Sequence, residues 1–303
     1  MMKITEFYDE IRRILPDLEI RANELMSKHT SFRIGGPAAV MAFPRNTEEL
    51  SILLKQSKML DIKTAILGAG TNVLAPDEGV DCLVICLKDC FGGIEHIDDT
   101  HIRVAAGVTM TRAALFAAGI GLSGLEFAHG IPGTVGGGVY MNAGAYGGEI
   151  CQVCAQVDVM DRDGNVRTLS SEQMEFSYRH SVLEETGDIV LSAVFALSHA
   201  PEEVIRGRMQ ELMKKRSASQ PLDLPSAGSA FKRPVGGYAA ALIDQAGLRG
   251  FQIGGAAISE KHAGFAVNLS GATAKDVKKL LKEVSDIVFE KSGIRLEPEV
   301  RIW

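Results

Sequence analysis

The chain lacks a surplus of positive charge. Its 303 residues include 32 Lys and Arg against 38 Asp and Glu, which gives a formal net charge of −6. Surfaces that bind nucleic acid need clustered Lys and Arg, often with aromatic side chains between them. Aromatic residues make up only 6 % of this chain and do not alternate with basic ones. Nucleic acid is therefore not an expected partner.

Long apolar runs are missing as well. Segments such as "CLVICL" are far shorter than the roughly 20 residues that a helix needs to cross a bilayer. The opening segment, "MMKITEFYDEIRRILPDL", mixes acidic with apolar residues and has no basic region followed by an apolar core. It therefore does not resemble a secretion signal. We expect a cytoplasmic protein without membrane insertion.

Cysteine is scarce and odd in number, with five residues in the whole chain. This count argues against a disulfide framework. Cys151 and Cys154 form a C-x-x-C pair, but no second pair and no histidine cluster stands at zinc spacing. Cys82, Cys86 and Cys90 have helical spacing, yet the β-branched residues around them favour a buried strand. Reduced structural cysteines and no metal site are expected.

Several motifs of common enzymes are absent. No G-K-[ST] follows any glycine turn, and neither G-x-S-x-G nor H-E-x-x-H occurs, so P-loop, serine hydrolase and metalloprotease classes lose their usual support. G-x-G-x-x-G occurs as "GIGLSG" at residues 119–124, but it follows a helical pattern and does not lie between a strand and a helix. A helix end followed by a turn is the favoured interpretation, and a Rossmann fingerprint is not.

Helical and strand patterns are both present, which predicts an α+β fold. Short strands separated by turns such as "RDGN" fill most of residues 81–199. Amphipathic helices are predicted at residues 4–15, 46–60, 109–119, 201–216, 237–248 and 273–290, the last opened by a T-x-x-D capping pattern. We expect three parts: an α/β subdomain at 1–80, a mainly β subdomain at 81–204 and an α/β domain at 205–303.

Two glycine-rich loops offer the clearest chemical signal. "LGAGTN" at residues 67–72 follows a predicted strand, and "GIPGTVGGG" at 130–138 has five glycines and no charge. Glycines allow successive amides to point into one concavity and bind an anion. Enzymes that transfer phosphoryl groups bring Lys, Arg or a metal to the reacting phosphate. Because no such cation is present, we favour a cofactor pyrophosphate that the loops bind and that does not react. The alternative is that both loops are simply turns that connect strands.

Longer motifs resemble a known family. "HTSFRIGGPA", "LGAGTN", "GLEFAHGIPGTVGGGVYMNAGAYGGE", "YRHS", "AGSAFKRP", "AGLRGFQIGGAAISEKHAGFAVN" and "EPEVRIW" occur in the order seen in the UDP-N-acetylenolpyruvoylglucosamine reductases, the MurB family of peptidoglycan synthesis. The resemblance spans residues 29–301. The chain lacks the insertions of the branch in which a tyrosine loop closes over substrate, so it is similar to the shorter branch.

The resemblance implies a two-part FAD-binding domain, like that of the PCMH and vanillyl-alcohol oxidase flavoproteins, and a C-terminal substrate-binding domain. It implies non-covalent FAD that NADPH reduces before a UDP-sugar enters the same cleft. Hydride then passes to the methylene carbon of the enolpyruvyl ether, and the product is UDP-N-acetylmuramate. The family's FAD-binding positions correspond here to Gly68, Gly70, Thr71, Asn72, Gly130, Ile131, Pro132, Gly133, Thr134, Gly136 and Gly137.

The resemblance also implies three catalytic residues. Ser229 matches the family's proton donor, Arg179 the arginine that polarises the substrate carboxylate, and Glu299 the glutamate that assists the arginine. A hydroxyl is a poor acid, so Ser229 can serve only because the carbon that receives its proton is strongly basic. A guanidinium facing a carboxylate is a strong, directional contact. Glu299 would need to be protonated, or hydrogen-bonded through a partner, beside that carboxylate.

Some positions depart from the expected family pattern. Thr71 and His129 stand where serine is frequent, and Arg233 stands where many members have asparagine. Thr71 keeps a hydroxyl, whereas His129 and Arg233 leave the local contacts with the flavin and the sugar nucleotide open. Arg216, Lys232 and Arg233 are the candidates for binding the UDP phosphates.

The residues also allow two other functions. Another PCMH-type FAD oxidoreductase, acting on an alcohol or hydroxy acid, would not need Ser229, Arg179 and Glu299 together and would often tether FAD through His or Cys. A non-catalytic flavin- or nucleotide-binding module would need only the glycine loops. Flavin that precipitates with acid-denatured protein would favour the oxidase, and folded protein without flavin would exclude a flavoprotein. We expect a monomer that binds a small UDP-sugar.

Overall fold

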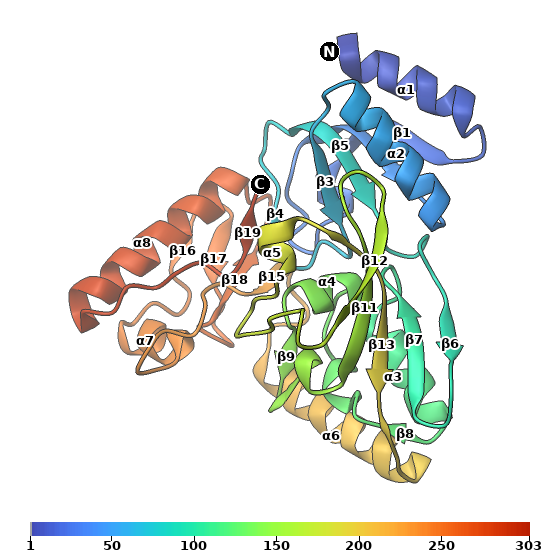
Figure 1. Cartoon of the computed structure of the whole chain (residues 1–303). Coiled ribbons are helices and arrows are strands. Elements are labelled where there is room, and N and C mark those ends of the chain that lie inside the picture. Colours follow the sequence, from blue (N-terminus) through green and yellow to red (C-terminus); the bar gives the residue numbers. More distant parts are fainter. Residues whose placement is uncertain (1) are drawn as a thin grey trace. The chain divides into compact units, whose positions relative to one another are not determined.

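The structure is a computed structural model that describes residues 2–303 (Figure 1). The Cα positions divide the chain into two compact units. Unit 1 comprises residues 2–23, 39–69 and 81–214, and unit 2 comprises residues 24–38, 70–80 and 215–303. Each unit has its own buried apolar cluster. The predicted division by function at residues 80 and 204 stays a prediction, because compactness does not show which part binds a cofactor.

The first sheet contains the strand that leads into the first glycine loop. β3 (Thr64–Leu67) pairs in parallel with β5 (Val80–Cys86), in the sheet order β1-β2-β5-β3. The other two strands are β1 (Glu19–Leu25) and β2 (Pro37–Phe43). The helices beside them in sequence are α1 (Met2–Ile14) and α2 (Thr47–Met59). The side chain of Asn46 accepts a hydrogen bond from the Glu49 amide, which fixes the start of α2.

The middle of the chain forms an antiparallel sheet of order β12-β11-β13-β7-β6. These strands are β12 (Val166–Ser170), β11 (Cys154–Met160), β13 (Ile189–Ala196), β7 (His101–Ala105) and β6 (Ile94–His96). The helices of this region are α3 (Met110–Gly119), α4 (Val135–Tyr140), α5 (Leu183–Thr186) and α6 (Glu202–Ser219). The predicted mainly β character of residues 81–199 is therefore confirmed.

Short strand pairs and 3₁₀ turns lie between the longer strands and helices in sequence. β8 (Leu122–Ser123) pairs antiparallel with the distant β14 (Ser198–His199), and β9 (Gly144–Ala145) forms a small hairpin with β10 (Gly148–Glu149). Three 3₁₀ turns are η1 (Met26–Lys28), η2 (Glu126–Ala128) and η3 (Ile150–Gln152). The segment "GIGLSG" is the end of α3 followed by a turn, as predicted, with Gly121 in the left-handed region. α6 extends three residues beyond its predicted end at residue 216.

Unit 2 is a small antiparallel sheet covered by α8. The strands have the order β15-β18-β17-β16, and Figure 1 shows α8 beside them. These elements are β15 (Ser226–Ser229), β18 (Phe265–Asn268), β17 (Ala256–Ile258), β16 (Gln252–Ile253), α7 (Ala239–Gln245) and α8 (Ala274–Ser292). β19 (Arg301–Ile302) pairs in parallel with β4 (Val73–Leu74), so the end of the chain lies beside the segment that follows the first glycine loop.

The two faces of this sheet differ. Ala266 belongs to the main cluster of unit 2, which includes Val277 and Leu281 from α8. The neighbouring residues of β18, Phe265 and Val267, belong to a separate small cluster. This alternation is the period of two expected of a strand. One face of the sheet is therefore covered by helix and the other by only a few apolar side chains.

The start of α8 is capped twice. Thr273 and Asp276 form the capping box that the T-x-x-D pattern predicts, with the Asp276 amide donating to the Thr273 hydroxyl at 3.0 Å. Asp77, far away in sequence, accepts hydrogen bonds from the amides of Ala274 at 2.7 Å and Lys275 at 3.1 Å. A carboxylate at a helix N-terminus also interacts favourably with the helix dipole. Asp77 therefore fastens the segment after the first glycine loop to α8.

None of the helices described in residues 2–303 is long and apolar enough to span a membrane.

We predict that Asp77→Ala lowers the free energy of unfolding by about 1–2 kcal/mol, because the first amides of α8 lose their acceptor. Urea denaturation followed by circular dichroism measures the loss. Asp99→Ala is the control, since the Asp99 carboxylate is exposed and pairs with exposed His199. Equal stability of the Asp77 and Asp99 variants would contradict the capping role.

Candidate active site

The first glycine loop leaves β3 at Leu67 and has room only for glycine at two positions. A Cβ atom on Gly68 would lie 2.4 Å from the Thr134 hydroxyl oxygen. Gly70 has a φ of +62°, and a Cβ there would lie 2.0 Å from the His29 carbonyl oxygen. At both positions, any side chain larger than that of glycine would therefore clash with another segment of the protein. Of the predicted FAD-binding glycines, Gly68 is packed against the Thr134 side chain and Gly70 against the main chain at His29.

The amides of this loop are available to a ligand. Within residues 2–303, no backbone amide from Gly68 to Asn72 donates a hydrogen bond to another protein group. Gly70 is itself buried, so its amide also has little access to water. Buried backbone donors are almost always paired in folded proteins. A run of unpaired amides in a glycine loop is the arrangement that binds pyrophosphate oxygens, and the loop therefore fits the FAD that the sequence predicts.

The second glycine loop is held against the end of β7. The Met110 amide donates to the Gly133 carbonyl at 2.9 Å, and Thr134 is the N-cap of α4, with its hydroxyl accepting from the Gly137 amide. A Cβ on Gly136 would lie 2.9 Å from the Cβ of Ala106. Close packing therefore explains Gly136, and helix capping explains the buried Thr134 hydroxyl.

Three amides of the second loop remain for a ligand. In the described part of the chain, the amides of Gly130, Gly133 and Thr134 donate to no protein acceptor. Ile131 and Pro132 lie between these amides, and the Ile131 amide itself donates to the Ala128 carbonyl at 3.0 Å. The loop thus offers several N–H groups without any cationic side chain, like the first one. Both loops fit a cofactor phosphate that is held but not transferred.

His129 precedes the second loop and carries an orphaned polar atom. Its Nδ1 atom is buried and has no hydrogen-bond partner among residues 2–303. Burial lowers the pKa of His129 from its ordinary value of 6.5, so the neutral ring is favoured. The His129 carbonyl accepts a hydrogen bond from the Thr111 hydroxyl at 2.7 Å, which fixes the main chain. A neutral ring with an unpaired nitrogen beside Gly130 is consistent with a bound group at this loop.

Unit 2 brings together three residues of the predicted site. Ser229 ends β15, and the carbonyl of the next residue, Ala230, accepts a hydrogen bond from the Glu299 amide at 2.9 Å. The Asn72 side chain donates to the Glu299 carbonyl at 3.3 Å, and the Asn72 carbonyl accepts from the Arg301 amide at 3.0 Å. Glu299 therefore lies between the segment of Asn72 and the end of β15 at Ser229, although the chain separates these residues widely.

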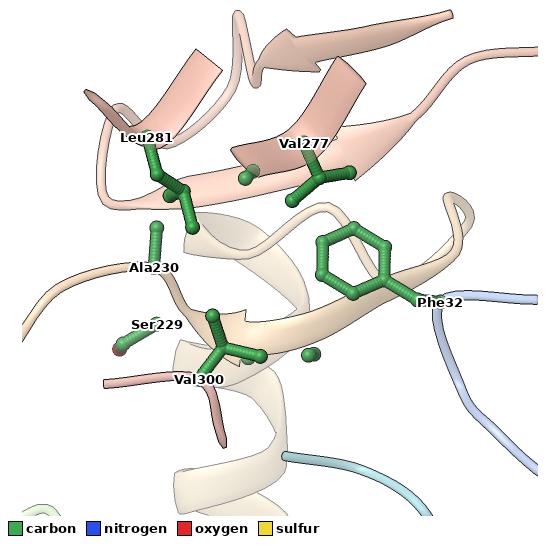
Figure 2. Close-up of a pocket in the computed structure, with 9 residues that line it drawn as sticks. Phe32, Ser229, Ala230, Val277, Leu281 and Val300 are labelled. Carbon is green, nitrogen blue, oxygen red and sulfur yellow. The ribbon is translucent and has the colours of Figure 1, made fainter. Parts of the chain in front are cut away.

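Ser229 is presented on the less covered face of the sheet. Figure 2 shows a small apolar gap lined by Phe32, Val277, Leu281 and Val300, with the Ser229 side chain pointing away from it. Ser229 is exposed and is paired across the strands with Phe265 of the small cluster. Side chains of paired residues lie on the same face of a sheet. The apolar gap is thus the core that supports the strand, and the hydroxyl lies on the opposite side.

Arg179 lies in unit 1, in a tight turn. Ser177 and His180 exchange hydrogen bonds between their main chains at 3.2 Å, and Arg179 between them has a φ of +56°. Its guanidinium donates to the Gly144 carbonyl at 3.4 Å and lies 5.2 Å from the ring centroid of Tyr178. A left-handed arginine is uncommon and strained, and such residues cluster at functional sites. The turn therefore holds Arg179 in a defined orientation beside the "NAGAYGG" segment.

Asn142 supports this turn, and sequence reasoning missed it. Its side chain is 1 % exposed, donates to the Ser177 carbonyl and to the Glu149 carboxylate at 3.0 Å each, and accepts from the Cys151 amide at 3.0 Å. Its φ of +41° is also left-handed. A polar residue inside an otherwise small and apolar segment was the signal that could have found it. Asn142 therefore fixes the turn that carries Arg179.

The candidates for UDP contacts have different surroundings. The Lys232 ammonium is exposed and lies 3.6 Å from the Glu297 carboxylate. The Arg233 guanidinium lies 4.2 Å from the ring centroid of exposed Tyr238, within range of a cation–π contact. Arg216 is 9 % exposed. Lys232 and Arg233 closely follow Ser229, so they lie near the proposed proton donor, whereas Arg216 belongs to the end of α6.

The cysteines lack the properties of reactive or metal-binding groups. All five are free, and burial raises the pKa of Cys82 to about 11 and that of Cys154 to about 12. Thiols with such pKa values stay protonated near neutral pH. In residues 2–303, no group of three or more His, Cys, Asp or Glu is placed to hold a metal ion.

Comparison with known proteins identifies the family of each part of the chain. The model of the UDP-N-acetylenolpyruvoylglucosamine reductase C-terminal domain matches residues 220–303, and an FAD binding domain model matches residues 37–170. The chain is 45 % identical over 294 residues to UDP-N-acetylenolpyruvoylglucosamine reductase of Caldanaerobacter subterraneus subsp. tengcongensis, covering 97 % of both chains. It is 45 % identical over 307 aligned residues to the enzyme of that name from Agathobacter rectalis, covering 98 % of both.

A solved structure is also similar over nearly its whole length. The crystal structure of UDP-N-acetylenolpyruvylglucosamine reductase (MurB) from Thermus caldophilus superimposes with a TM-score of 0.81 at 37 % sequence identity. The match covers 94 % of this chain and 98 % of the Thermus chain. The predicted fold, an FAD-binding domain followed by a MurB C-terminal domain, is therefore confirmed.

We predict that Gly68→Ala lowers the free energy of unfolding by about 1–3 kcal/mol, because the new methyl group overlaps the Thr134 hydroxyl. Thr134→Ala removes that oxygen, so the double variant should lose less than the sum of the two single losses. Urea denaturation of the four proteins completes the cycle. Gly119→Ala is the control, since no atom lies within 4 Å of the added Cβ. Strict additivity would contradict the predicted overlap.

The lowered pKa of His129 predicts a pH-dependent stability. Because the unfolded chain binds the proton first, the free energy of unfolding falls as pH drops below about 6.5, until the folded imidazole is also protonated. His129→Gln should make this decline shallower in denaturation series between pH 7.5 and about 4.5. Burial of His262 contributes in the same direction, so the decline should not vanish. An unchanged slope in the His129 variant would show that its ring protonates equally in both states.

Proposed function

Because the chain belongs to the family of UDP-N-acetylenolpyruvoylglucosamine reductases, we propose that it is a flavoenzyme of peptidoglycan precursor synthesis. The substrate is UDP-N-acetyl-3-O-(1-carboxyvinyl)-glucosamine, the reductant is NADPH, and the product is UDP-N-acetylmuramate. The observation that carries this proposal is that Glu299 is hydrogen-bonded both to Asn72 and to Ala230, the residue that follows Ser229 in unit 2. A module that only binds flavin has no use for a serine and a glutamate beside its cofactor loop.

The residues that would hold the cofactor are the two glycine loops. The amides from Gly68 to Asn72, and those of Gly130, Gly133 and Thr134, would donate to the pyrophosphate oxygens of FAD. When bound, FAD supplies the hydride that it has taken from NADPH. The protein fixes both loops by close packing at glycine positions, so the donors are ordered before the ligand arrives.

Ser229 would supply the proton. Hydride addition to the methylene carbon of the enolpyruvyl group leaves the adjacent carbon strongly basic, so a hydroxyl can protonate it if the distance is right. Ser229 is exposed at the end of β15, so its hydroxyl can reach a ligand and recover a proton from solvent. The Glu299 main chain is fixed at two points, through Ala230 and Asn72, which holds this residue beside the end of the strand that carries Ser229.

Arg179 would bind the substrate carboxylate and stabilise the negative charge that the enolate places on it. A guanidinium suits this role because it stays charged and can pair with both carboxylate oxygens. Support for the role comes from the turn, which holds Arg179 in a left-handed conformation braced by Asn142. Arg216, Lys232 and Arg233 would contact the UDP phosphates. A cytoplasmic location, the monomeric state and a role in cell division and cell shape stay predictions.

We predict that Ser229→Ala retains FAD but reduces the UDP-sugar about 10²- to 10⁴-fold more slowly, because the general acid is lost. The assay follows NADPH absorbance with and without the enolpyruvyl UDP-sugar, and stopped flow measures flavin reduction by NADPH alone, which should be unchanged. Ser270→Ala, at an exposed position, is the control. Glu299→Gln and Arg179→Lys should also slow UDP-sugar reduction and leave the visible flavin spectrum in place.

Four results would contradict the proposal. Full UDP-sugar reduction by folded Ser229→Ala protein would exclude Ser229 as the proton donor. NADPH oxidation that is independent of the UDP-sugar would point to another PCMH-type oxidoreductase, as would flavin that stays with acid-precipitated protein. Purified folded protein that binds no FAD would exclude the flavoenzyme altogether.

A further inference from the structure

Ser31 connects two parts of the site that the reaction needs in register. It lies in the loop between η1 and β2, within the "HTSFRIGG" segment. The Ser31 amide donates to the Gly70 carbonyl at 3.0 Å, and its hydroxyl donates to the Ser226 carbonyl at 2.6 Å. The same hydroxyl oxygen lies 3.3 Å from the Gly70 carbonyl. A single hydroxyl proton serves one acceptor well, and the shorter contact assigns it to Ser226.

At the cofactor loop, this bond holds a residue in an unusual conformation. Gly70 is buried and left-handed, and its own amide has no acceptor in the described chain. The carbonyl of Gly70 is the group that Ser31 holds. The Ser31 loop is itself closed by two further bonds, from the Arg33 amide to the Thr30 carbonyl and from the Thr30 hydroxyl to the Ile34 carbonyl. The Gly70 carbonyl and the Thr71 amide belong to one planar peptide unit, so a rigid loop fixes the direction of the Thr71 amide, which is unpaired within residues 2–303.

Ser31 also holds β15, the strand that ends at Ser229. It supplies a hydrogen bond at an edge where the sheet offers no neighbouring strand. Among the strands described in residues 2–303, β15 lies at the edge of its sheet and pairs only with β18. Its register shifts between Ser226 and Ser229, and Gly228 between them has a φ of +77°. A bulge of this kind weakens the ladder and changes where the strand points its side chains. The Ser31 hydroxyl bonds the first residue of β15 on the edge that has no neighbouring strand.

We propose that Ser31 is a positioning residue that sets the Gly70 cofactor loop and the Ser229 strand in register with each other. This inference rests on the proposed function, because it assumes that Gly70 contacts FAD and that Ser229 donates a proton. Proton transfer tolerates little displacement, and a shift of about 1 Å can lower a rate 10²-fold. Ser31 acts through Gly70 and Ser229 and needs no contact with the substrate.

The test compares Ser31→Ala with Ser31→Thr and with Ser57→Ala. Thr keeps the hydroxyl. Ser57 is a matched control, since its buried hydroxyl also donates to a backbone carbonyl, that of Leu54 at 2.8 Å, in a helix of unit 1. Fluorescence titration of the apoproteins gives the FAD dissociation constant. Stopped flow at saturating FAD gives the rates of flavin reduction by NADPH and of flavin reoxidation by the enolpyruvyl UDP-sugar.

We expect Ser31→Ala to weaken FAD binding about tenfold and to slow reoxidation by the UDP-sugar about tenfold, while flavin reduction by NADPH stays within about twofold. Ser31→Thr should restore both values, and Ser57→Ala should change neither. Unchanged FAD binding and reoxidation in Ser31→Ala would overturn the inference. Equal slowing of both half-reactions, or an equal effect of Ser57→Ala, would also overturn it, because general loss of stability explains such results.

The two proposals can fail separately. If wild-type protein binds FAD but does not oxidise NADPH with the UDP-sugar, the proposed function is wrong. The FAD dissociation constants of the Ser31 variants then still decide whether Ser31 fixes the cofactor loop, and an unchanged value for Ser31→Ala overturns that part too.

Discussion

Unpaired backbone amides in two glycine loops are the constraint on which this site depends. Leaving a buried donor without an acceptor costs free energy, so the surrounding chain must hold each loop in place by other contacts. Here those contacts are close approaches that only glycine allows, at Gly68 against Thr134 and at Gly70 against the His29 carbonyl. Packing thus keeps the donors turned toward a ligand and prevents them from pairing within the protein.

In unit 2, main-chain contacts likewise hold the residues proposed for catalysis. Glu299 is fixed through its amide and its carbonyl, and Asn72 uses both its side chain and its main chain to hold the final strand. Ser229 ends a bulged edge strand whose core side is filled by Phe32 and Val300. Hydrogen bonds of backbone groups therefore hold in place the segments that carry the proposed catalytic side chains. This arrangement leaves the Ser229 side chain on the less covered face of the sheet.

Local patterns predicted much of this fold. The periodicity of α2 and α8, with Asn46 and Thr273 at their starts, was visible because caps and apolar stripes are local features. The glycine loops were visible for the same reason. Their cofactor and the roles of Ser229, Arg179 and Glu299 came from family resemblance, since a lone serine, arginine or glutamate has no distinguishing local pattern.

Other parts could not be predicted, because they depend on residues far apart in sequence. Asp77 caps α8 across 197 residues, and Ser31 reaches Ser226 across 195. No periodicity or spacing signals such pairs. The bond that supports the left-handed turn of Arg179 was also hidden, since the Asn142 side chain reaches the Ser177 carbonyl across 35 residues. The fold alone determines these contacts.

The bond between Asn72 and Glu299 has a consequence for how the protein is made. These residues are 227 positions apart, and a ribosome adding 5–20 residues per second needs roughly 10–45 s to travel between them. During that interval the first glycine loop has emerged but lacks the strand that holds Asn72. The parallel pair of β4 and β19 can form only once Arg301 and Ile302 have been synthesised. Completion of the cofactor loop is therefore a late event, and the nascent chain must wait for its own C-terminal residues before that loop is fully braced.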